Sequence, residues 1–332
     1  MVLNNSISFC EITQKISDAR VYLMGIAMFM VILFHCNCWP FSFFGYWGTD
    51  IFILLSGFGI CFSLQKTKSV SSFYWRRFIR IAPAAVLCGT FFYLLLPPHR
   101  QAALAPFSLN LWYIRTILIF YAISPFLYYV IRRWEYKACA LLIVSSELAA
   151  YATPSVCAHL LQHNNPFIVA TLSWSLAHLP LFVVGMALPN IAKQSNLRIP
   201  MWVLFCFALI GLILLSMFRE CQMVYNLNYV RYLFMPGSIL LIPTIIYGAI
   251  CVDGCLRHCP RLLLQILHFL GLFSLEIYLI HETVLRVVPH IESFVLSPAL
   301  AKAICIVISL LLAWLVNRLC RILQTWALPS RH

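Results

Sequence analysis

The candidates for chemistry in this sequence are ionisable side chains that lie within or beside long apolar stretches. They are His35, Asp50, Arg115, His281 and Glu282. A neutral imidazole can take a proton from an attacking hydroxyl, a carboxylate can orient that imidazole, and a guanidinium can stabilise an oxyanion. If the fold brings these groups together they predict an acid–base site, although each one alone is also compatible with an interfacial residue that reaches water.

A second candidate is the basic segment from Ser72 to Pro83, which carries Arg76, Arg77 and Arg80. Residues three or four positions apart lie on one face of a helix, so the three guanidinium groups can converge. Planar guanidinium groups bind phosphate through paired hydrogen bonds. The alternative is a cytoplasmic anchor that meets anionic lipid.

The composition decides what kind of protein must position these residues. Hydrophobic residues make up 62% of the 332 positions and charged residues only 10%, whereas a soluble domain carries about 25% charge. This excludes a soluble protein with an ordinary surface and argues against a nucleic-acid-binding module. The net charge of +13 is explained by the Lys and Arg that accumulate in the cytoplasmic loops of membrane proteins.

Ten apolar stretches are long enough to cross a bilayer, which takes about 20 helical residues. They are continuous rather than alternating, so helices are predicted. We expect an all-α polytopic membrane protein with about ten transmembrane helices, one domain over residues 1–332 and no appended soluble domain. The stretches are Val21–Trp39, Gly48–Leu64, Ile79–Leu96, Leu111–Ile131, Lys137–Thr153, Phe167–Leu188, Met201–Phe218, Tyr232–Val252, Leu263–His281 and Phe294–Val316.

The basic residues predict the orientation of these spans. With the N-terminus inside, 17 of the 23 Lys and Arg residues fall on the inner side, which is a strong positive-inside bias. Both termini are then cytoplasmic. In this topology four helices place His35, Asp50, Arg115, His281 and Glu282 at one depth near the outer surface. If these helices are neighbours, the catalytic residues are His35 and Asp50, and the acceptor-side pocket beside them is lined by Trp112, Arg115, His281 and Glu282.

Other polar features predict less. His178 lies near the middle of the sixth stretch without an obvious partner, which favours a packing or hydrogen-bonding role. The 14 cysteines are scattered, and the spacing of Cys251, Cys255, His258 and Cys259 matches no usual zinc pattern, so we expect no metal site. No phosphate-binding loop or hydrolase motif is present.

Six blocks follow one another along the chain: Gly25–His35, Gly48–Phe58, Phe73–Pro83, Leu111–Ile114, Phe182–Gly185 and Ser274–His281. Their order and spacing, over about residues 20–285, resemble the acyltransferase family 3 membrane proteins. The second block is similar to that family's pattern Gly-x-Asp-x-Phe-Phe-x-x-Ser-Gly-Phe. The last block is similar to its pattern Ser-x-x-Leu-Tyr-Leu-x-His.

The resemblance implies transfer of an acyl group, usually acetyl from cytoplasmic acetyl-CoA as co-substrate, to a hydroxyl of an envelope carbohydrate. It implies that His35 is the catalytic histidine and that Arg77 and Arg80 contact the acyl donor. Asp50 falls inside the second-helix pattern, and we expect Asp50 or Glu282 to orient the ring of His35 and Arg115 to stabilise the oxyanion.

One position departs from the family pattern. The family usually places Arg or Lys eleven residues before the histidine, where this chain has Met24. Arg20 is one turn earlier, about 40° round the helix, and we expect it to supply the missing charge; a changed donor site is the alternative. Arg76 at the CoA phosphates and Ser56 beside the passage of the acyl arm complete the predicted donor contacts.

The expected partners are acyl-CoA, an exported or lipid-linked glycan such as lipopolysaccharide or capsule, and the bilayer, with no nucleic acid and no permanently bound cofactor. The expected location is the cytoplasmic (inner) membrane of a bacterium. A polytopic transporter or a non-catalytic subunit of a polysaccharide assembly complex is the alternative. Transporters usually have inverted repeats and polar binding sites near the midplane of the membrane. This chain has no detectable inverted repeats, and its polar groups lie at the two faces, which favours the enzyme.

Overall fold

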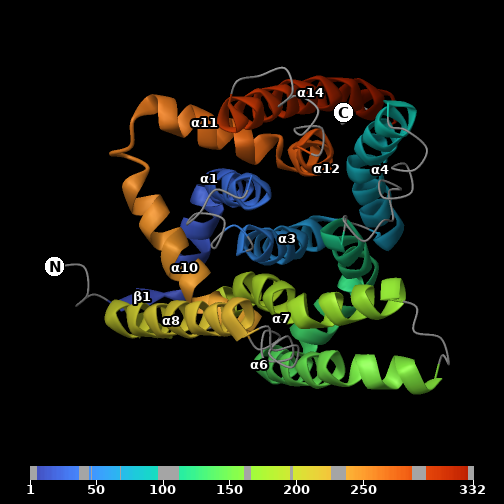
Figure 1. The fold of residues 1–332 in the computed structure, drawn as a ribbon. Coiled ribbons are helices and arrows are strands. Elements are labelled where there is room, and N and C mark those ends of the chain that lie inside the picture. The colour runs from blue at the N-terminus through green and yellow to red at the C-terminus, as the bar shows by residue number, and fades with distance from the viewer. Residues whose placement is uncertain are drawn as a thin grey trace. The chain divides into compact units, whose positions relative to one another are not determined.

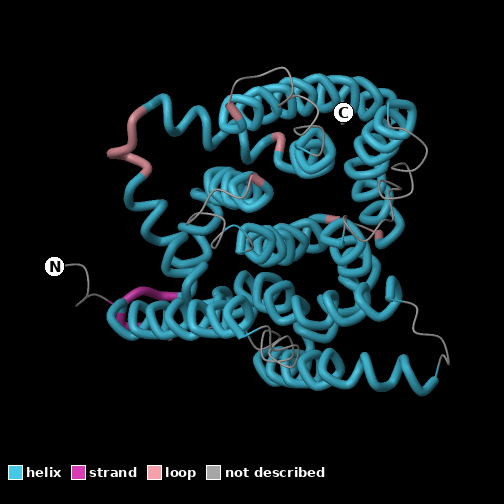
Figure 2. The backbone as a smooth tube through the Cα atoms, in the orientation of Figure 1, coloured by secondary structure: helices cyan, strands magenta, loops and turns pink. Residues whose placement is uncertain are grey.

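The computed structural model describes residues 6–36, 45, 47–67, 69–95, 112–160, 166–194, 197–225, 237–285 and 297–327. Helices dominate these residues, and the all-α prediction is confirmed (Figures 1 and 2). The helices are α1 (Phe9–His35), α3 (Trp47–Lys66), α4 (Val70–Leu95), α6 (Trp112–Leu160), α7 (Pro166–Gln194), α8 (Met201–Tyr225), α10 (Gly237–Cys255), α11 (Arg261–Leu272), α12 (Ser274–Leu285) and α14 (Pro298–Ala327). Five ends of predicted spans lie outside the described residues: Trp39, Leu96, Leu111, Tyr232 and Phe294.

Each of the ten predicted stretches overlaps a helix, or part of one. Within the described residues, five helices are long and apolar enough to cross a membrane, and α11 with α12 makes a sixth if the bent pair is counted as one span. The apolar parts described for α8 and α10, Met201–Leu214 and Leu241–Cys255, are shorter. The chain is therefore a multi-pass membrane protein, while ten spans stays a prediction.

The fourth and fifth predicted spans form one helical segment, α6, that is broken at Glu135. This residue has φ 50° and ψ −129°, values that do not belong to a helix. A positive φ is unfavourable for a side chain other than glycine, so the backbone is strained at this point. The break follows Arg132 and Arg133, where the sequence predicted a connection.

The chain divides into two compact units, and the first comprises Met1–Arg20, Asp50–Thr67 and Thr116–Pro260. Its N-terminal end has a feature that the sequence did not predict, a short antiparallel pairing of β1 (Ser6–Ser8) with β2 (Arg198–Pro200) (Figure 2). Ser8 then begins α1 in a capping box: its amide donates to Glu11 Oε2 at 2.7 Å, and its hydroxyl accepts from the Glu11 amide at 3.2 Å.

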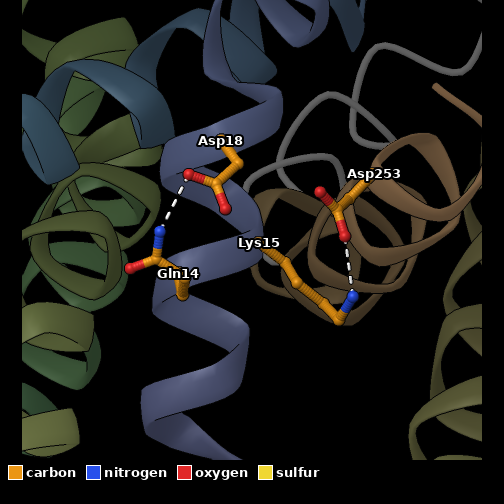
Figure 3. A network of polar contacts seen from close by, with 4 residues as sticks. All are labelled: Gln14, Lys15, Asp18 and Asp253. Carbon is orange, nitrogen blue, oxygen red and sulfur yellow. Dashed lines mark hydrogen bonds and ion pairs between the residues drawn. The ribbon is translucent and has the colours of Figure 1, made fainter. Parts of the chain in front are cut away.

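Two polar contacts steady the start of α1, as Figure 3 shows. Lys15 Nζ lies 2.7 Å from Asp253 Oδ2, which ties α1 to the end of α10. Gln14 Nε2 donates to Asp18 Oδ1 at 2.8 Å within the helix. Further along the first unit, Thr244 of α10 donates to the Ala208 carbonyl of α8 at 2.9 Å, so α8 and α10 pack as a pair.

Helices α3 and α7 pack closely in the first unit because glycines meet the opposite backbone. A Cβ on Gly57 would overlap the carbonyl of Phe182, and a Cβ on Gly185 would overlap the carbonyl of Leu54. Small residues serve this purpose in membrane helices. Beyond this crossing Gln65 Nε2 donates to Asn190 Oδ1 at 3.4 Å, which carries the contact toward the C-terminal ends of both helices.

The second unit comprises Val21–Thr49, Lys68–Arg115 and Arg261–His332. Here α1 crosses α11, again at glycines: a Cβ on Gly25 would overlap the Leu267 carbonyl, and one on Gly271 would overlap the Val21 carbonyl. Helix α14 packs against α12 and α4 (Figure 1), with Gln324 Nε2 donating to the Ile79 carbonyl at 3.3 Å.

The ninth predicted span is not one continuous helix. The chain bends by 85° between α11 and α12. Phe273 stands at the bend: its amide donates to the Phe269 carbonyl at 3.1 Å, and its own carbonyl accepts from the Ile277 amide at 2.9 Å. The bend directly follows the point at which Gly271 touches α1, and it gives α12 a direction different from that of α11.

We expect Gly57→Ala to destabilise the protein by about 1–3 kcal/mol, because the added methyl group would push against the α7 backbone. Gly248→Ala in α10 is the matched control. Apart from the adjacent residues and the backbone of its own helix, no described atom lies within 4 Å of a Cβ at that position, and alanine gains about 1 kcal/mol of helix propensity over glycine. Thermal unfolding in nanodiscs measures both; a Gly57→Ala protein that melts at or above the wild-type temperature would contradict the packing argument.

Candidate active site

Two of the predicted site histidines meet in the second unit. The rings of His35, at the end of α1, and His281, in α12, have centroids 4.9 Å apart and planes inclined by 71°. His281 is 2% exposed and its Nδ1 donates to the Ile277 carbonyl at 2.8 Å. This bond fixes the proton on Nδ1 when the ring is neutral, so Nε2 presents a lone pair. Among the described residues, Nε2 has no hydrogen-bond partner.

Tyr278 links this histidine pair to other predicted site residues. Its ring centroid is 5.8 Å from that of His281 and 5.0 Å from that of Tyr113 in α6. The phenol also lies within electrostatic range of Arg115 and Glu282. Tyr278, His281 and Glu282 are three and four positions apart, so they share one face of α12.

The second unit therefore brings together most of the residues predicted for the acceptor side. Arg115 is buried, Glu282 is half-buried, and the indole of Trp112 is half-buried beside Tyr113 with centroids 6.3 Å apart. Imidazole, phenol, carboxylate and guanidinium groups at this end of α1, α6 and α12 can accept a proton, donate hydrogen bonds and stabilise negative charge. Because two imidazolium ions in contact repel each other, the contact disfavours a state in which both rings are charged.

Helix α12 is held in place by a buried acid. Glu276 is 5% exposed, and its Oε1 accepts a hydrogen bond from Asn317 Nδ2 of α14 at 2.7 Å. A carboxylate in the first turn of a helix also interacts favourably with the helix dipole. The contact fixes the helix that carries Tyr278 and His281 against its neighbour.

Asp50 lies in the first unit. Its partner there is His178, a residue that the sequence analysis did not pair with it. His178 Nε2 is 3.2 Å from Asp50 Oδ1, and both side chains are buried. The pairing of Asp50 with His35 stays a prediction, because these two residues belong to different units.

Arg20 and Ser56, two predicted donor contacts, also lie in the first unit. Arg20 Nη2 donates to the Leu55 carbonyl at 3.5 Å, so the guanidinium rests beside Ser56 on α3. Gly59 makes room for it, since a Cβ there would overlap the guanidinium. Ser56 is half-buried. A carbonyl contact of this kind holds the charge of Arg20 within an otherwise apolar helix pair.

The other three predicted donor residues lie on the first turns of α4. The guanidinium carbon of Arg77 is 5.4 Å from the centroid of Phe73, a fully buried ring, which fixes its position by a cation–π contact. Arg76 is half-buried and Arg80 is exposed. Trp75 and Phe78 stack at 5.8 Å on the exposed side of the same turns, as aromatic residues do at a membrane interface.

Sequence reasoning missed two tyrosines and one partner. Tyr278 could have been found, because it stands one turn before His281 on the same helix face. Tyr113 has no comparable spacing signal, and the partner of His178 comes from a distant helix. In the part of the chain that the structure describes, no group of three or more His, Cys, Asp or Glu side chains could hold a metal ion.

The acyltransferase domain family has a sequence model that matches residues 22–318 of this chain. The match covers nearly the whole protein, including the helices that carry His35, His281 and the α4 arginines. The chain therefore belongs to this family of acyltransferase membrane proteins. Searches of the curated proteins and of the solved structures find no match to it.

We expect Asn317→Ala to lower the free energy of unfolding by about 1–3 kcal/mol, because Glu276 would lose a partner while buried. Leu319→Ala, at an exposed position on the same helix, serves as the control and should have a smaller effect. Chemical or thermal unfolding compares the two; equal stability of the Asn317 variant and wild type would show that Glu276 does not depend on this bond.

Proposed function

We propose that the protein is a membrane O-acyltransferase. It moves an acyl group, acetyl in the first instance, from cytoplasmic acyl-CoA to a hydroxyl of an exported polysaccharide, lipopolysaccharide, capsule or lipid-linked sugar. The observation that carries the proposal is the contact of His35 with His281 in a chain of the acyltransferase family. His281 is a buried imidazole whose Nε2 is set as a proton acceptor, so it suits a relay for a proton that His35 takes from a hydroxyl.

We place the protein in the inner membrane of a bacterium, with ten spans and both termini in the cytoplasm. The overlap of the ten predicted stretches with helices supports the number, and the distribution of Lys and Arg supports the direction. On this topology α4 begins at the inner face, and His35 and His281 lie near the outer face. Donor and acceptor sites are thus proposed at opposite ends of the helices.

The donor is held at the inner end. CoA carries phosphate groups that do not enter hydrocarbon, so Arg76, Arg77 and Arg80 bind them there while the thinner, less polar acyl arm passes between helices. The cation–π contact of Arg77 with Phe73 limits the freedom that this side chain loses on binding. Arg20 and Ser56 line the proposed path of the arm.

The reaction is transfer of the acyl carbon from sulfur to oxygen. The oxygen of the acceptor hydroxyl attacks the thioester carbon, and the neutral ring of His35 takes the proton of that hydroxyl during the attack. The carbon–sulfur bond then breaks, and the proton passes to the leaving CoA thiolate, so the products are an ester and free CoA. A variant of the same chemistry has His35 accept the acyl group first and pass it to the hydroxyl.

The neighbouring residues have separate proposed roles. His281 relays the proton from His35 or contacts the acceptor, and Arg115 stabilises the oxyanion. Glu282 or Asp50 stabilises the imidazolium form of His35. Trp112 provides an apolar face against which a sugar ring can pack.

We expect His35→Ala to abolish acyl transfer and to leave membrane insertion intact, because the variant removes only the proposed base. The measurement is mass spectrometry of surface glycans from cells in which the gene is deleted and then complemented. His268→Ala is a control in the same unit, since His268 of α11 contacts Tyr22 of α1 and takes no part in the proposed chemistry.

Two results would argue against this function. Normal glycan acylation in His35→Ala cells would remove His35 from the reaction. If surface glycans keep their normal acylation in cells that lack the gene, the protein is not their acyltransferase. That result would favour a transporter or an assembly subunit, and the protein would then have to be assayed for those activities.

Arg77→Ala and Arg80→Ala should each raise the KM for acyl-CoA, because each removes a phosphate contact, with kcat less affected. Arg133→Ala is the matched control: it removes one exposed arginine from the same predicted face of the membrane. Initial rates in membrane vesicles at varied acetyl-CoA concentration give both constants. A change confined to use of the acceptor would place the donor site elsewhere.

A further inference from the structure

A buried histidine outside the proposed reaction centre engages both of its ring nitrogens. His178 in α7 is 6% exposed, and its partner Asp50 in α3 is 3% exposed. Nδ1 of His178 is 2.7 Å from the Trp174 carbonyl, and Nε2 is 3.2 Å from Asp50 Oδ1. The rings of Trp174 and His178 are nearly parallel, at 6° and 6.0 Å, so the orientation of the imidazole is restricted as well.

These contacts determine how many protons the pair holds. A carbonyl oxygen can only accept, so Nδ1 must carry a hydrogen. Nε2 lies at ion-pair distance from Oδ1, so an ionised Asp50 favours a second hydrogen on Nε2, and His178 is then an imidazolium beside a carboxylate. If the proton instead sits on Asp50, a neutral acid faces a neutral imidazole. Both forms contain the same number of protons and have no net charge.

Electroneutrality is what this environment requires. A lone carboxylate in an apolar segment is costly, whereas a charge with a close counter-ion is tolerated.

We propose that His178 is a positioning residue of the transferase: it holds Asp50 as a carboxylate in a fixed, electroneutral pair. The inference rests on the proposed function, in the form in which Asp50 rather than Glu282 acts during acyl transfer. His178 itself touches no reacting atom and acts through Asp50. The sequence block that contains Asp50 therefore depends on a residue of a helix more than a hundred positions further along the chain.

The surrounding packing makes this pair a defined unit. Asp50, Leu54 and Gly57 lie at successive turns of α3, and Leu54 and Gly57 meet α7 at Gly185 and Phe182. The close crossing of the two backbones fixes the separation at which Asp50 and His178 meet. Substitutions at Asp50 or His178 therefore test the pair without altering the glycines that form the helix crossing.

The experiment compares the variants Asp50→Asn, His178→Gln and the double variant with wild type in membrane vesicles from cells that lack the chromosomal gene. Radiolabelled acetyl-CoA is the probe, and label in the glycan and lipid-linked fractions gives kcat and KM per folded protein. Thermal unfolding of the same proteins in nanodiscs gives Tm. Ser175→Ala is the matched control, because Ser175 is also buried in α7, where its hydroxyl pairs with Thr116 at 3.3 Å.

We expect His178→Gln to lower kcat about 100-fold, the scale on which positioned acid–base groups act, with KM for acetyl-CoA changed less than about twofold. Its Tm falls, because a buried carboxylate has lost its counter-ion. The double variant removes both charges, so Tm recovers toward wild type while kcat stays low. Ser175→Ala keeps the wild-type kcat.

Three outcomes overturn the inference, and they are distinct. If folded His178→Gln protein has the wild-type kcat, His178 serves only in packing and does not position Asp50. Additive losses of Tm in the double variant would show that the two side chains are not paired. An inactive wild-type protein would overturn the proposed function itself, and the positioning role with it, whatever the Tm values are.

Discussion

The structure depends on one constraint: a polar or charged group in an apolar helix bundle must find a partner within the protein. The described helices meet this constraint repeatedly with side chains from separate elements. Glu276 accepts from Asn317, Arg20 donates to the Leu55 carbonyl, and Asp50 faces His178. Each contact links two helices, so satisfying a polar group also fixes how the helices pack. The groups able to do chemistry are therefore held by the same interactions that hold the fold.

Glycines determine where these contacts can form. In the first unit Gly57 and Gly185 let α3 and α7 touch through their backbones, and the Asp50–His178 pair lies a short way along the same interface. In the second unit Gly25 and Gly271 do the same for α1 and α11, after which the chain bends by 85° into α12. A helix that carries His281 can thus reach His35 even though the preceding helix runs in another direction.

The proposed function uses both ends of this arrangement. In this proposal acyl-CoA is too charged to cross the bilayer and the acceptor is an exported glycan, so the transferase binds the two on different sides and lets only the acyl arm meet the hydroxyl. Guanidinium groups on the first turns of α4 suit the phosphates, because Arg77 is preoriented on Phe73. The pair of imidazoles suits the hydroxyl, because a proton taken by His35 can pass to His281, whose Nε2 is set as a proton acceptor by the bond of Nδ1 to the Ile277 carbonyl.

The sequence alone determined which segments are helices and the family, because these follow from apolar length and local spacing along one chain. It also predicted a common depth for His35 and His281, and the structure shows that the two rings are in contact. Only the tertiary structure decided that Asp50 pairs with His178, that Tyr113 joins Tyr278, and that α11 and α12 are separated by a sharp bend. Depth is a position along a helix, whereas contact also depends on how each helix is rotated and which helix is its neighbour. Those two quantities arise from packing between distant segments, which no local pattern records.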